Sequence, residues 1–456
     1  MTTAPSRADL VTRLAALTPG QRDRLRGRIP RALADKRRPT PGQRRLWLTQ
    51  QRLPGRPVDV VCQAVHLTGG PVDLDLLAER VRGFAARHEA LRTTFQEDGS
   101  GLRPVVHDEL PPRLARTRCA DADEAHRLAG ELAAEPFDLA AGPLLRVVLA
   151  DGSAPDEAWL LVVVHNLVFD AWSFELLLDE LARPADTEPA AAPAFSDHAQ
   201  GLRQWIAGPE GQEAAAYWAG EVADAPPPLP TDRPRTADGT SREGGRVDFT
   251  VSRDVTEAIA AAAQRAAATA YTGWLAVAWA ALAEFGGRAD VLLGTFTAGR
   301  DRPGTAEVAG YLLNVLPVRL RDPGDGSHAA RTRAARTATR SGLRHAAYPG
   351  ELIAAEVSPP RVPGTHALLD AVFVFDNLGE GGREIQGARA TTADLDKGTA
   401  RYDLTLSVYP GPEGTEGWIE YDSELYDAAT VRRLAERFTA LATAAAEAGG
   451  GDGDQG

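Results

Sequence analysis

The chain has 456 residues, of which 43% are hydrophobic, and this supports a substantial core in one bilobal unit or in two domains. Its formal net charge of −13 argues against nucleic-acid binding, which requires a basic face. The sequence has no run of 18 apolar residues and no apolar segment near its N-terminus, so we expect a cytoplasmic protein without a membrane span.

Cysteine and histidine are sparse in this sequence. The two cysteines, Cys62 and Cys119, lack the spacing of metal ligands, and the nine histidines are scattered along the chain. We therefore predict buried thiols in a reducing compartment and no bound metal.

The N-terminal part of the chain begins with helical patterns. Residues 1–36 are rich in Arg and Ala, with Leu at roughly helical spacing, which predicts a helical lead-in. A helix is expected over residues 40–53 with Thr40 as its N-cap, followed by a strand at 58–68 and a helix at 74–88.

A buried strand is expected over residues 159–165, because this run is apolar and largely β-branched. It ends in His165 and Asn166, and an amphipathic helix begins near Trp172. Because side chains alternate along a strand, His165 and Asn166 should face opposite sides. We expect Asn166 to face a cleft, with His165 packed on the other side.

The second half again alternates strands and helices, which predicts an α/β fold. Prolines and glycines over residues 226–245 indicate a linker. A strand at 246–251, one long Ala-rich helix at 255–285 and a buried strand at 291–300 follow. Residues 446–456 are rich in Gly and Asp and are expected to be disordered.

The segment from residue 165 to residue 173 resembles the His-His-x-x-x-Asp-Gly motif of the condensation domains of nonribosomal peptide synthetases. The positions that match the motif and its trailing Trp-Ser pair are His165, Asp170, Trp172 and Ser173. Two positions depart from it. Asn166 stands where the family carries its active-site His, and Ala171 replaces the Gly.

Other segments extend this resemblance over residues 37–445. Residues 87–95 are similar to the second family motif, which implies that Arg92 lies at the base of the active-site loop. Arg300 and Asn314 fall on the polar positions of the fifth motif. Because the family pairs the motif Asp with an Arg, the resemblance implies an ion pair between Asp170 and Arg300.

The family belongs to the chloramphenicol acetyltransferase-like acyltransferases, and this implies an α/β (α+β) fold of two such lobes in a V-shaped pseudo-dimer. The expected divisions are the lead-in 1–36, a first lobe 37–225, the linker 226–245, a second lobe 246–445 and the tail 446–456. The resemblance implies a free-standing condensation enzyme of natural-product biosynthesis. It would join an acyl thioester on a peptidyl or acyl carrier protein to an amine or an alcohol. It would bind no cofactor itself, because the acyl group travels on the carrier's phosphopantetheine arm.

The replaced histidine leaves two hypotheses open. The carboxamide of Asn166 cannot act as a base, but it can donate a hydrogen bond to an oxyanion. Ser173 lacks a Gly-x-Ser-x-Gly elbow and is expected to cap a helix. The first hypothesis is an acyltransferase with Asn166, His165 and Asp170 at its active site, supported by the matching residues named above. The second is a catalytically impaired module that binds carrier proteins or recruits a tailoring enzyme.

Overall fold

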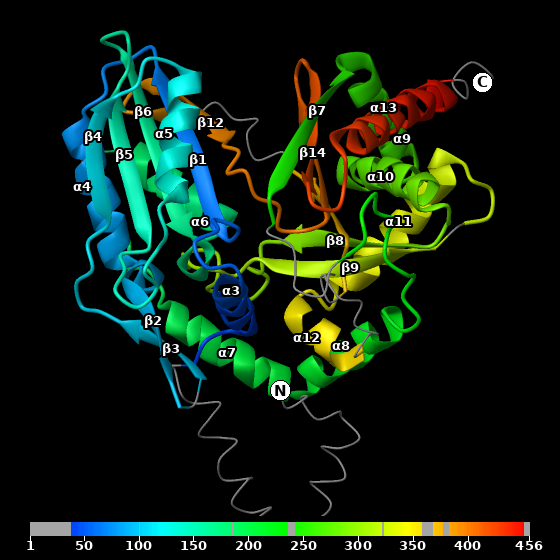
Figure 1. Ribbon diagram of the computed structural model, residues 1–456, viewed down its shortest axis with the longest axis horizontal. Helices are drawn as coiled ribbons and strands as arrows, with labels where there is room; N and C mark the ends of the chain where they lie inside the picture. The colour runs from blue at the N-terminus through cyan, green and yellow to red at the C-terminus, as the bar shows by residue number, and fades with distance from the viewer. Residues whose placement is uncertain are drawn as a thin grey trace, which may run out of the picture.

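The computed structural model describes residues 38–450 apart from residue 100 and the segments 185–186, 236–241, 322, 358–367 and 377–382. Two lobes, each built on a six-stranded mixed sheet with helices, form a V (Figure 1). This confirms the predicted α/β class and the bilobal arrangement. The expected lead-in 1–36 lies outside the described residues.

The first sheet has the strand order β11-β12-β1-β6-β5-β4, in which β4 and β5 run parallel and the other neighbours antiparallel. Its strands are β1 (Val60–Thr68), β4 (Arg113–Arg118), β5 (Leu145–Asp151), β6 (Glu157–His165), β11 (Arg383–Ile385) and β12 (Ala388–Asp394). A separate hairpin consists of β2 (Thr93–Asp98) and β3 (Gly101–Val106).

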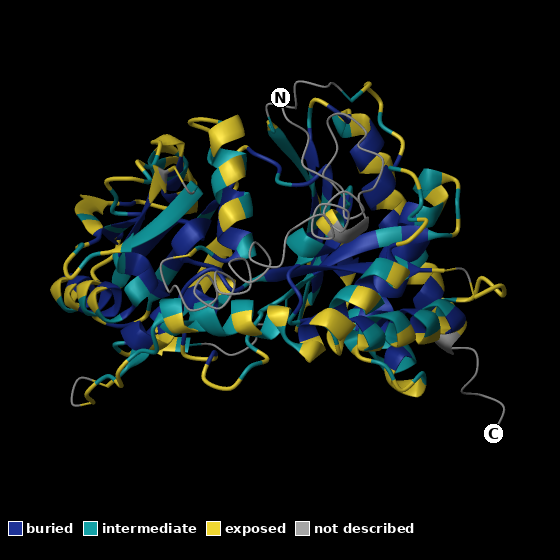
Figure 2. Cartoon of the chain, turned by 90° about the horizontal axis from the view of Figure 1, so that it is seen from below, coloured by how far each residue is buried: buried dark blue, intermediate teal, exposed yellow. Residues whose placement is uncertain are grey.

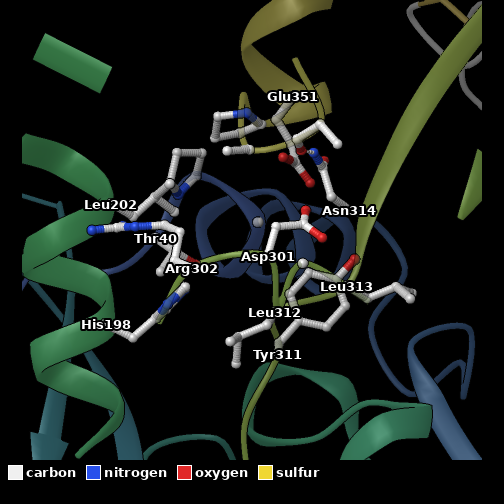
Figure 3. Close-up of a pocket in the computed structure, with 16 residues that line it drawn as sticks. Thr40, His198, Leu202, Asp301, Arg302, Tyr311, Leu312, Leu313, Asn314 and Glu351 are labelled. Carbon is white, nitrogen blue, oxygen red and sulfur yellow. Dashed lines mark hydrogen bonds between the residues drawn. The ribbon is translucent and has the colours of Figure 1, made fainter. Parts of the chain in front are cut away.

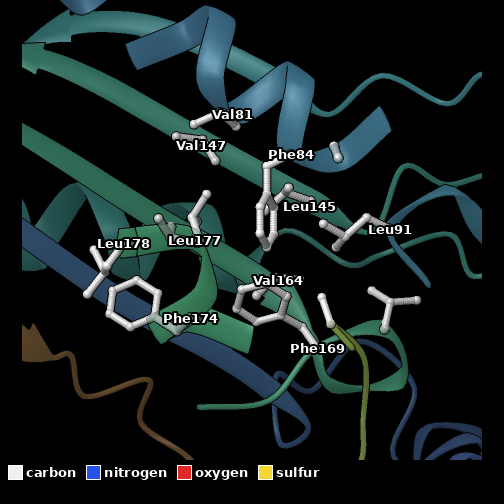
Figure 4. Packing of buried hydrophobic residues seen from close by; sticks show 14 of the residues in the cluster. Val81, Phe84, Leu91, Leu145, Val147, Val164, Phe169, Phe174, Leu177 and Leu178 are labelled. Carbon is white, nitrogen blue, oxygen red and sulfur yellow. The ribbon is translucent and has the colours of Figure 1, made fainter. Parts of the chain in front are cut away.

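Helices cover both faces of the first sheet, which explains why β6 is apolar at almost every position. Leu160, Val162 and Val164 of β6 pack with α4 (Leu74–Arg87) and α6 (Ala171–Ala182). Figure 4 shows this packing, in which Val164 and Phe169 lie close to Phe84. Leu161 and Val163 instead pack with α5 (Ala122–Ala134). The sheet therefore holds the loop after β6 between two layers.

The second sheet has the order β7-β14-β13-β10-β8-β9. Its strands are β7 (Gly244–Ser252), β8 (Val291–Thr297), β9 (Asn314–Leu320), β10 (Ala371–Phe375), β13 (Leu404–Gly411) and β14 (Gly414–Asp422). The helices that pack with it are α9 (Arg253–Arg265), α10 (Ala270–Gly286), α11 (His328–Leu343) and α13 (Ala428–Gly450). Figure 2 shows that the strands of both lobes are mostly buried and that exposed residues lie on outer helix faces. Trp274 and Trp279 of α10 are buried.

Helices at the base of the V connect the lobes (Figure 1). They are α3 (Pro41–Arg52), α7 (Phe195–Ala207), α8 (Pro209–Glu221) and α12 (Gly350–Val357). The N-cap predicted for α3 is confirmed, because Thr40 Oγ1 accepts a hydrogen bond from the Gln43 amide at 3.1 Å. Arg45 of α3 bonds Glu351 of α12 at 3.2 Å and the hydroxyl of Tyr311 at 3.0 Å.

The expected lobe boundaries are wrong at two places, because tertiary pairing overrides chain order. Strands β11 and β12 come from the second half of the chain but extend the first sheet, and β12 pairs with β1. Helix α8 precedes the linker but packs on the second lobe. There its buried Trp218 donates a hydrogen bond to the carbonyl of His345 at 3.0 Å.

Two predicted elements also differ from the structure. The single helix expected at 255–285 is two helices, α9 and α10, bent by 106° relative to each other. The expected disordered tail is helical over residues 446–450, where α13 continues, and residues 451–456 are outside the described part. Within the described residues no single helix qualifies as a membrane span, whereas α9 and α10 together pass by length and composition alone.

Candidate active-site loop

The loop after β6 is a short strand-to-helix connection that places polar side chains between the lobes. A 3₁₀ turn, η2 (Asn166–Val168), follows His165, and Asp170 is the N-cap of α6. Gln43 of α3 donates a hydrogen bond to the carbonyl of Leu167 at 3.0 Å. The apolar residues of the loop are fully buried, so the polar residues have a fixed position.

Asp170 locks this loop to the second lobe. Arg300 donates to both carboxylate oxygens of Asp170, at 2.7 and 3.0 Å, and the two side chains are 3% and 0% exposed. The amides of Leu312 and Leu313 bond to Oδ2 at 3.0 and 3.1 Å, and the amide of Ser173 bonds to Oδ1 at 2.9 Å. The ion pair expected between Asp170 and Arg300 is therefore present, and the carboxylate has a structural role.

Asn166 is held by charged residues from both ends of the chain. Its Oδ1 accepts a hydrogen bond from Arg401 Nη2 at 2.7 Å, and its backbone amide bonds to the carbonyl of Asp59 at 2.9 Å. The same Arg401 nitrogen lies 2.8 Å from the carboxylate of Asp59, which is buried. Asn166 Nδ2 contacts the carbonyl of Phe169 at 3.3 Å. The amide oxygen is thus occupied, and the NH₂ group is the part of the carboxamide left with donor capacity.

The expectation that Asn166 faces an open cleft is not met. Its side chain is buried, with 5% exposure for the residue, because Arg401 covers its oxygen. Asn166 does not line either of two cavities near the base of the V. A substrate that bonds to the oxygen of Asn166 would have to displace Arg401.

His165 is packed in the core, and Asp59 and Arg401, which also hold Asn166, act on it electrostatically. It is 1% exposed, its ring meets Phe137 edge-on, and its Nδ1 accepts a hydrogen bond from the Leu167 amide at 3.1 Å. Burial lowers the pKa of His165 to about 4, so the imidazole is neutral near pH 7. The packed-histidine interpretation is supported.

Ser173 and Trp172 stabilise the contact between α6 and the second lobe. Ser173 Oγ accepts a hydrogen bond from the amide of Gly310 at 2.9 Å and lies 2.7 Å from Asp170 Oδ1. Ser173 is therefore not the helix cap that the sequence suggested, since Asp170 holds that position. Trp172 Nε1 donates to the carbonyl of Ala306 at 2.8 Å.

Two other predicted site residues lie elsewhere. Arg92 donates from Nε to the carbonyl of Ala86 at 2.8 Å and from Nη1 to the carbonyl of His107. These bonds join α4 to the β2–β3 hairpin, so the expected position of Arg92 at the base of the loop is not supported. Asn314 binds two carbonyls and an amide in residues 346–350, at 2.8 Å each, and thereby fixes the segment before α12.

Sequence reasoning missed Arg401 and Asp59. Arg401 is 235 positions from Asn166 and lies between β12 of the first sheet and β13 of the second. An isolated Arg before a strand has no periodicity or spacing that indicates its partner. The one available signal was an acid, Asp59, within a segment expected to be a strand, because a buried acid needs a cation.

One of the two cavities, which we call the junction cavity, lies between α3, α7 and three loops at residues 299–302, 311–314 and 346–351 (Figure 3). Its volume is about 50 Å³. The second cavity, of about 280 Å³, lies between β3, η1 (Glu89–Arg92) and α7.

Comparisons with known proteins relate the sequence of this chain to one family. The family model described as "Condensation domain" matches residues 35–450. Phosphinothricin tripeptide synthetase PhsC of Streptomyces viridochromogenes is 33% identical over 475 residues, which cover 96% of this chain and 43% of that protein. Malpinin synthetase of Mortierella alpina is 30% identical over 409 residues, which cover 86% of this chain. The chain spans only 5% of that relative's length.

Solved structures show the same fold. The condensation domain of the Monacolin K polyketide synthase MokA has a TM-score of 0.81 at 21% identity, and the match covers 90% of this chain and 97% of that one. The X-domain from teicoplanin biosynthesis has a TM-score of 0.78 at 24% identity, with 91% and 96% covered. The chloramphenicol acetyltransferase-like fold predicted from the sequence is thereby confirmed.

Proposed function

Because this chain belongs to the condensation domain family, we propose that it forms an amide bond between a carrier-bound acyl group and an amine. The amine nitrogen attacks the thioester carbon, the C–S bond breaks, and the phosphopantetheine thiol leaves with the proton that the amine loses. A thioester is already activated, so holding the two substrates together contributes much of the rate. Ester formation from an alcohol is less favoured, because an alcohol depends more on a base.

The observation that carries this proposal is the pair of donors beside the locked loop. The Asn166 NH₂ group and the Arg401 guanidinium lie together at the junction of the lobes, on a loop fixed by Asp170 and Arg300. Two such donors could stabilise the oxyanion that forms when an amine adds to a thioester. His165 is buried and its Nδ1 is bonded to the Leu167 amide, so it is not an exposed base.

The substrates and partners follow from this proposed reaction. A peptidyl or acyl carrier protein would deliver the acyl group on its phosphopantetheine arm, and the protein itself would bind no cofactor. A small-molecule amine would be the acceptor. A cytoplasmic location, where such carriers are loaded, stays a prediction.

A second candidate function is a carrier-binding or enzyme-recruiting module without catalysis. The burial of Asn166 under Arg401 favours it, because the residue is only 5% exposed and its carboxamide oxygen is already bonded to Arg401. A solved neighbour with a TM-score of 0.76 at 25% identity is an X-domain in complex with OxyB from teicoplanin biosynthesis. Binding of a tailoring enzyme would be the corresponding activity here.

One set of variants separates the two functions. We would load a carrier protein with alanyl-phosphopantetheine, add a primary amine and measure amide product by mass spectrometry. The variants are Asn166→Ala and Asn166→His, with Gln204→Ala on the exposed face of α7 as a control for a lost surface carboxamide. Binding of the loaded carrier is measured in parallel.

Catalysis predicts that wild type and Gln204→Ala form product at equal rates. Asn166→Ala should lose about 10- to 1,000-fold, the effect of removing an oxyanion donor. Asn166→His should gain activity, up to about 100-fold, because a base becomes available. Carrier binding by wild type without turnover would instead support the second candidate.

A further inference from the structure

The junction cavity is lined by a guanidinium that has no direct partner among the described residues, although Glu210, which bonds to Trp205 Nε1 at 2.7 Å, interacts with it electrostatically. Arg302 lines this cavity, and its side chain makes neither a hydrogen bond nor an ion pair with any residue that the structure describes. Its Nη1 atom is buried. The neighbouring Arg300, in contrast, donates to Asp170 and to the carbonyls of Ala298 and Val308. A buried guanidinium nitrogen without a hydrogen-bond partner is costly, so its position needs an explanation.

His198 adds a second polar group to the same place. It lines the cavity from α7, and its buried Nδ1 also lacks a hydrogen-bond partner among the described residues. Figure 3 shows the Arg302 side chain reaching toward α7, beside the ring of His198. Gly201 makes this possible, because a Cβ there would lie 2.8 Å from Arg302 Nη2. The guanidinium therefore lies directly against the helix.

The acids that line the cavity do not supply the missing counter-charge. The carboxylate of Asp301 points to the opposite side from the Arg302 guanidinium (Figure 3). Glu351 is bonded to Arg45 at 3.2 Å. Burial lowers the pKa of Arg302, and burial together with Arg302 and Arg300 lowers the pKa of His198 to about 4. At pH 7 His198 is thus a neutral ring beside a charged guanidinium.

We propose that Arg302, with His198 beside it, binds a small oxyanion carried by one of the two substrates. A guanidinium binds carboxylates and phosphates through two parallel hydrogen bonds, and a neutral imidazole can donate one more. A cavity of about 50 Å³ suits such a head group and not a whole side chain. The anion is either the phosphate of the phosphopantetheine arm or a carboxylate of the acyl group. This inference rests on the proposed function for the identity of the substrates.

Paired probes that differ in one charged group test the site by binding alone. The phosphate pair is 4′-phosphopantetheine and pantetheine. The carboxylate pair is the succinyl and butyryl thioesters of N-acetylcysteamine. Calorimetry would give the dissociation constant of each probe for wild type, Arg302→Gln and Arg302→Lys, with Arg432→Gln as a control on the exposed face of α13.

A built oxyanion site predicts that wild type and Arg432→Gln prefer the charged member of one pair. Arg302→Gln should bind that charged probe about 10- to 100-fold more weakly, because charge-assisted hydrogen bonds are lost. Its affinity for the uncharged member of the pair should be unchanged. The affinity of Arg302→Lys for the charged probe should lie between those of wild type and Arg302→Gln. An ammonium keeps the positive charge but lacks the planar pair of donors of a guanidinium. A preference in the phosphate pair identifies the arm, and one in the carboxylate pair identifies the acyl group.

Stability provides an independent readout. Because the Arg302 side chain has no hydrogen bond or ion pair with a described residue to lose, Arg302→Gln should leave the unfolding temperature unchanged or raise it. The site is overturned if wild type prefers neither charged probe, if Arg302→Gln keeps the preference, or if the variant lowers the unfolding temperature without weakening binding. If wild type binds a charged probe but forms no amide product, only the catalytic proposal is refuted and the oxyanion site stands.

Discussion

The carboxylate of Asp170 shows how one residue holds the candidate loop. Its bonds to Arg300, Leu312 and Leu313 join β6 and α6 to a segment of the second lobe. Because the two charges are almost fully buried, each depends on the other for compensation. The main contribution of Asp170 is therefore to the position of Asn166 relative to the second lobe.

We predict that Asp170→Asn lowers the free energy of unfolding by about 3–5 kcal/mol, since it leaves the buried Arg300 without a counter-charge. Urea denaturation measures this change. The matched control is Asp248→Asn, which breaks an exposed pair with Arg246 and should cost less than about 1 kcal/mol. Equal effects of the two variants would contradict a structural role for the buried pair.

At the scale of elements, the break between α9 and α10 explains why the long-helix prediction was wrong. Ala267 has a φ of 52°, in the left-handed region, and its amide bonds to the carbonyl of Gln264 at 2.8 Å. The amide of Ala268 bonds to the carbonyl of Ala263 at 2.8 Å, and Thr269 caps the next helix. The Ala-rich composition favours one helix, but packing against α13 and α11 requires two.

We predict that Ala267→Gly raises the free energy of unfolding by about 1 kcal/mol, because glycine adopts this φ without strain. In Ala261→Gly, within α9, the same substitution at a helical position should instead cost about 1 kcal/mol. Chemical denaturation of both variants gives opposite signs if the backbone explanation holds. Destabilisation by both would show that the methyl group of Ala267 matters more than its φ.

At the scale of the whole molecule, several histidines are buried in a neutral state. Burial lowers the pKa values of His88, His165, His198 and His328 to about 4 each. Between pH 6.5 and 4 the unfolded chain binds protons on these residues that the folded chain does not. Stability should therefore fall as pH falls through this window. Asp370, with a pKa raised to about 6 mainly by burial, contributes in the opposite direction.

We predict that His165→Gln reduces the pH dependence of stability between pH 6.5 and 4.5 by at most about 1.4 kcal/mol per pH unit, the contribution of one histidine. Urea unfolding of wild type and variant at four pH values would show it. The exposed His126 serves as control, since His126→Gln should leave the slope unchanged. A slope in His165→Gln equal to that of wild type would mean that His165 titrates alike in both states.

The family, the bilobal fold, the strand before residue 165 and the Asp170–Arg300 pair could all be predicted from the sequence. The strand follows from local periodicity, whereas the family, the two lobes and the ion pair were implied by the resemblance of the motifs to those of a known family. The crossing of β11 and β12 into the first sheet and the cover of Arg401 over Asn166 were decided only by the tertiary structure. The tertiary structure also decided that Arg302 Nη1 is buried without a hydrogen-bond partner among the described residues. The reason is that such contacts join residues far apart in sequence, and these leave no periodic pattern in either partner.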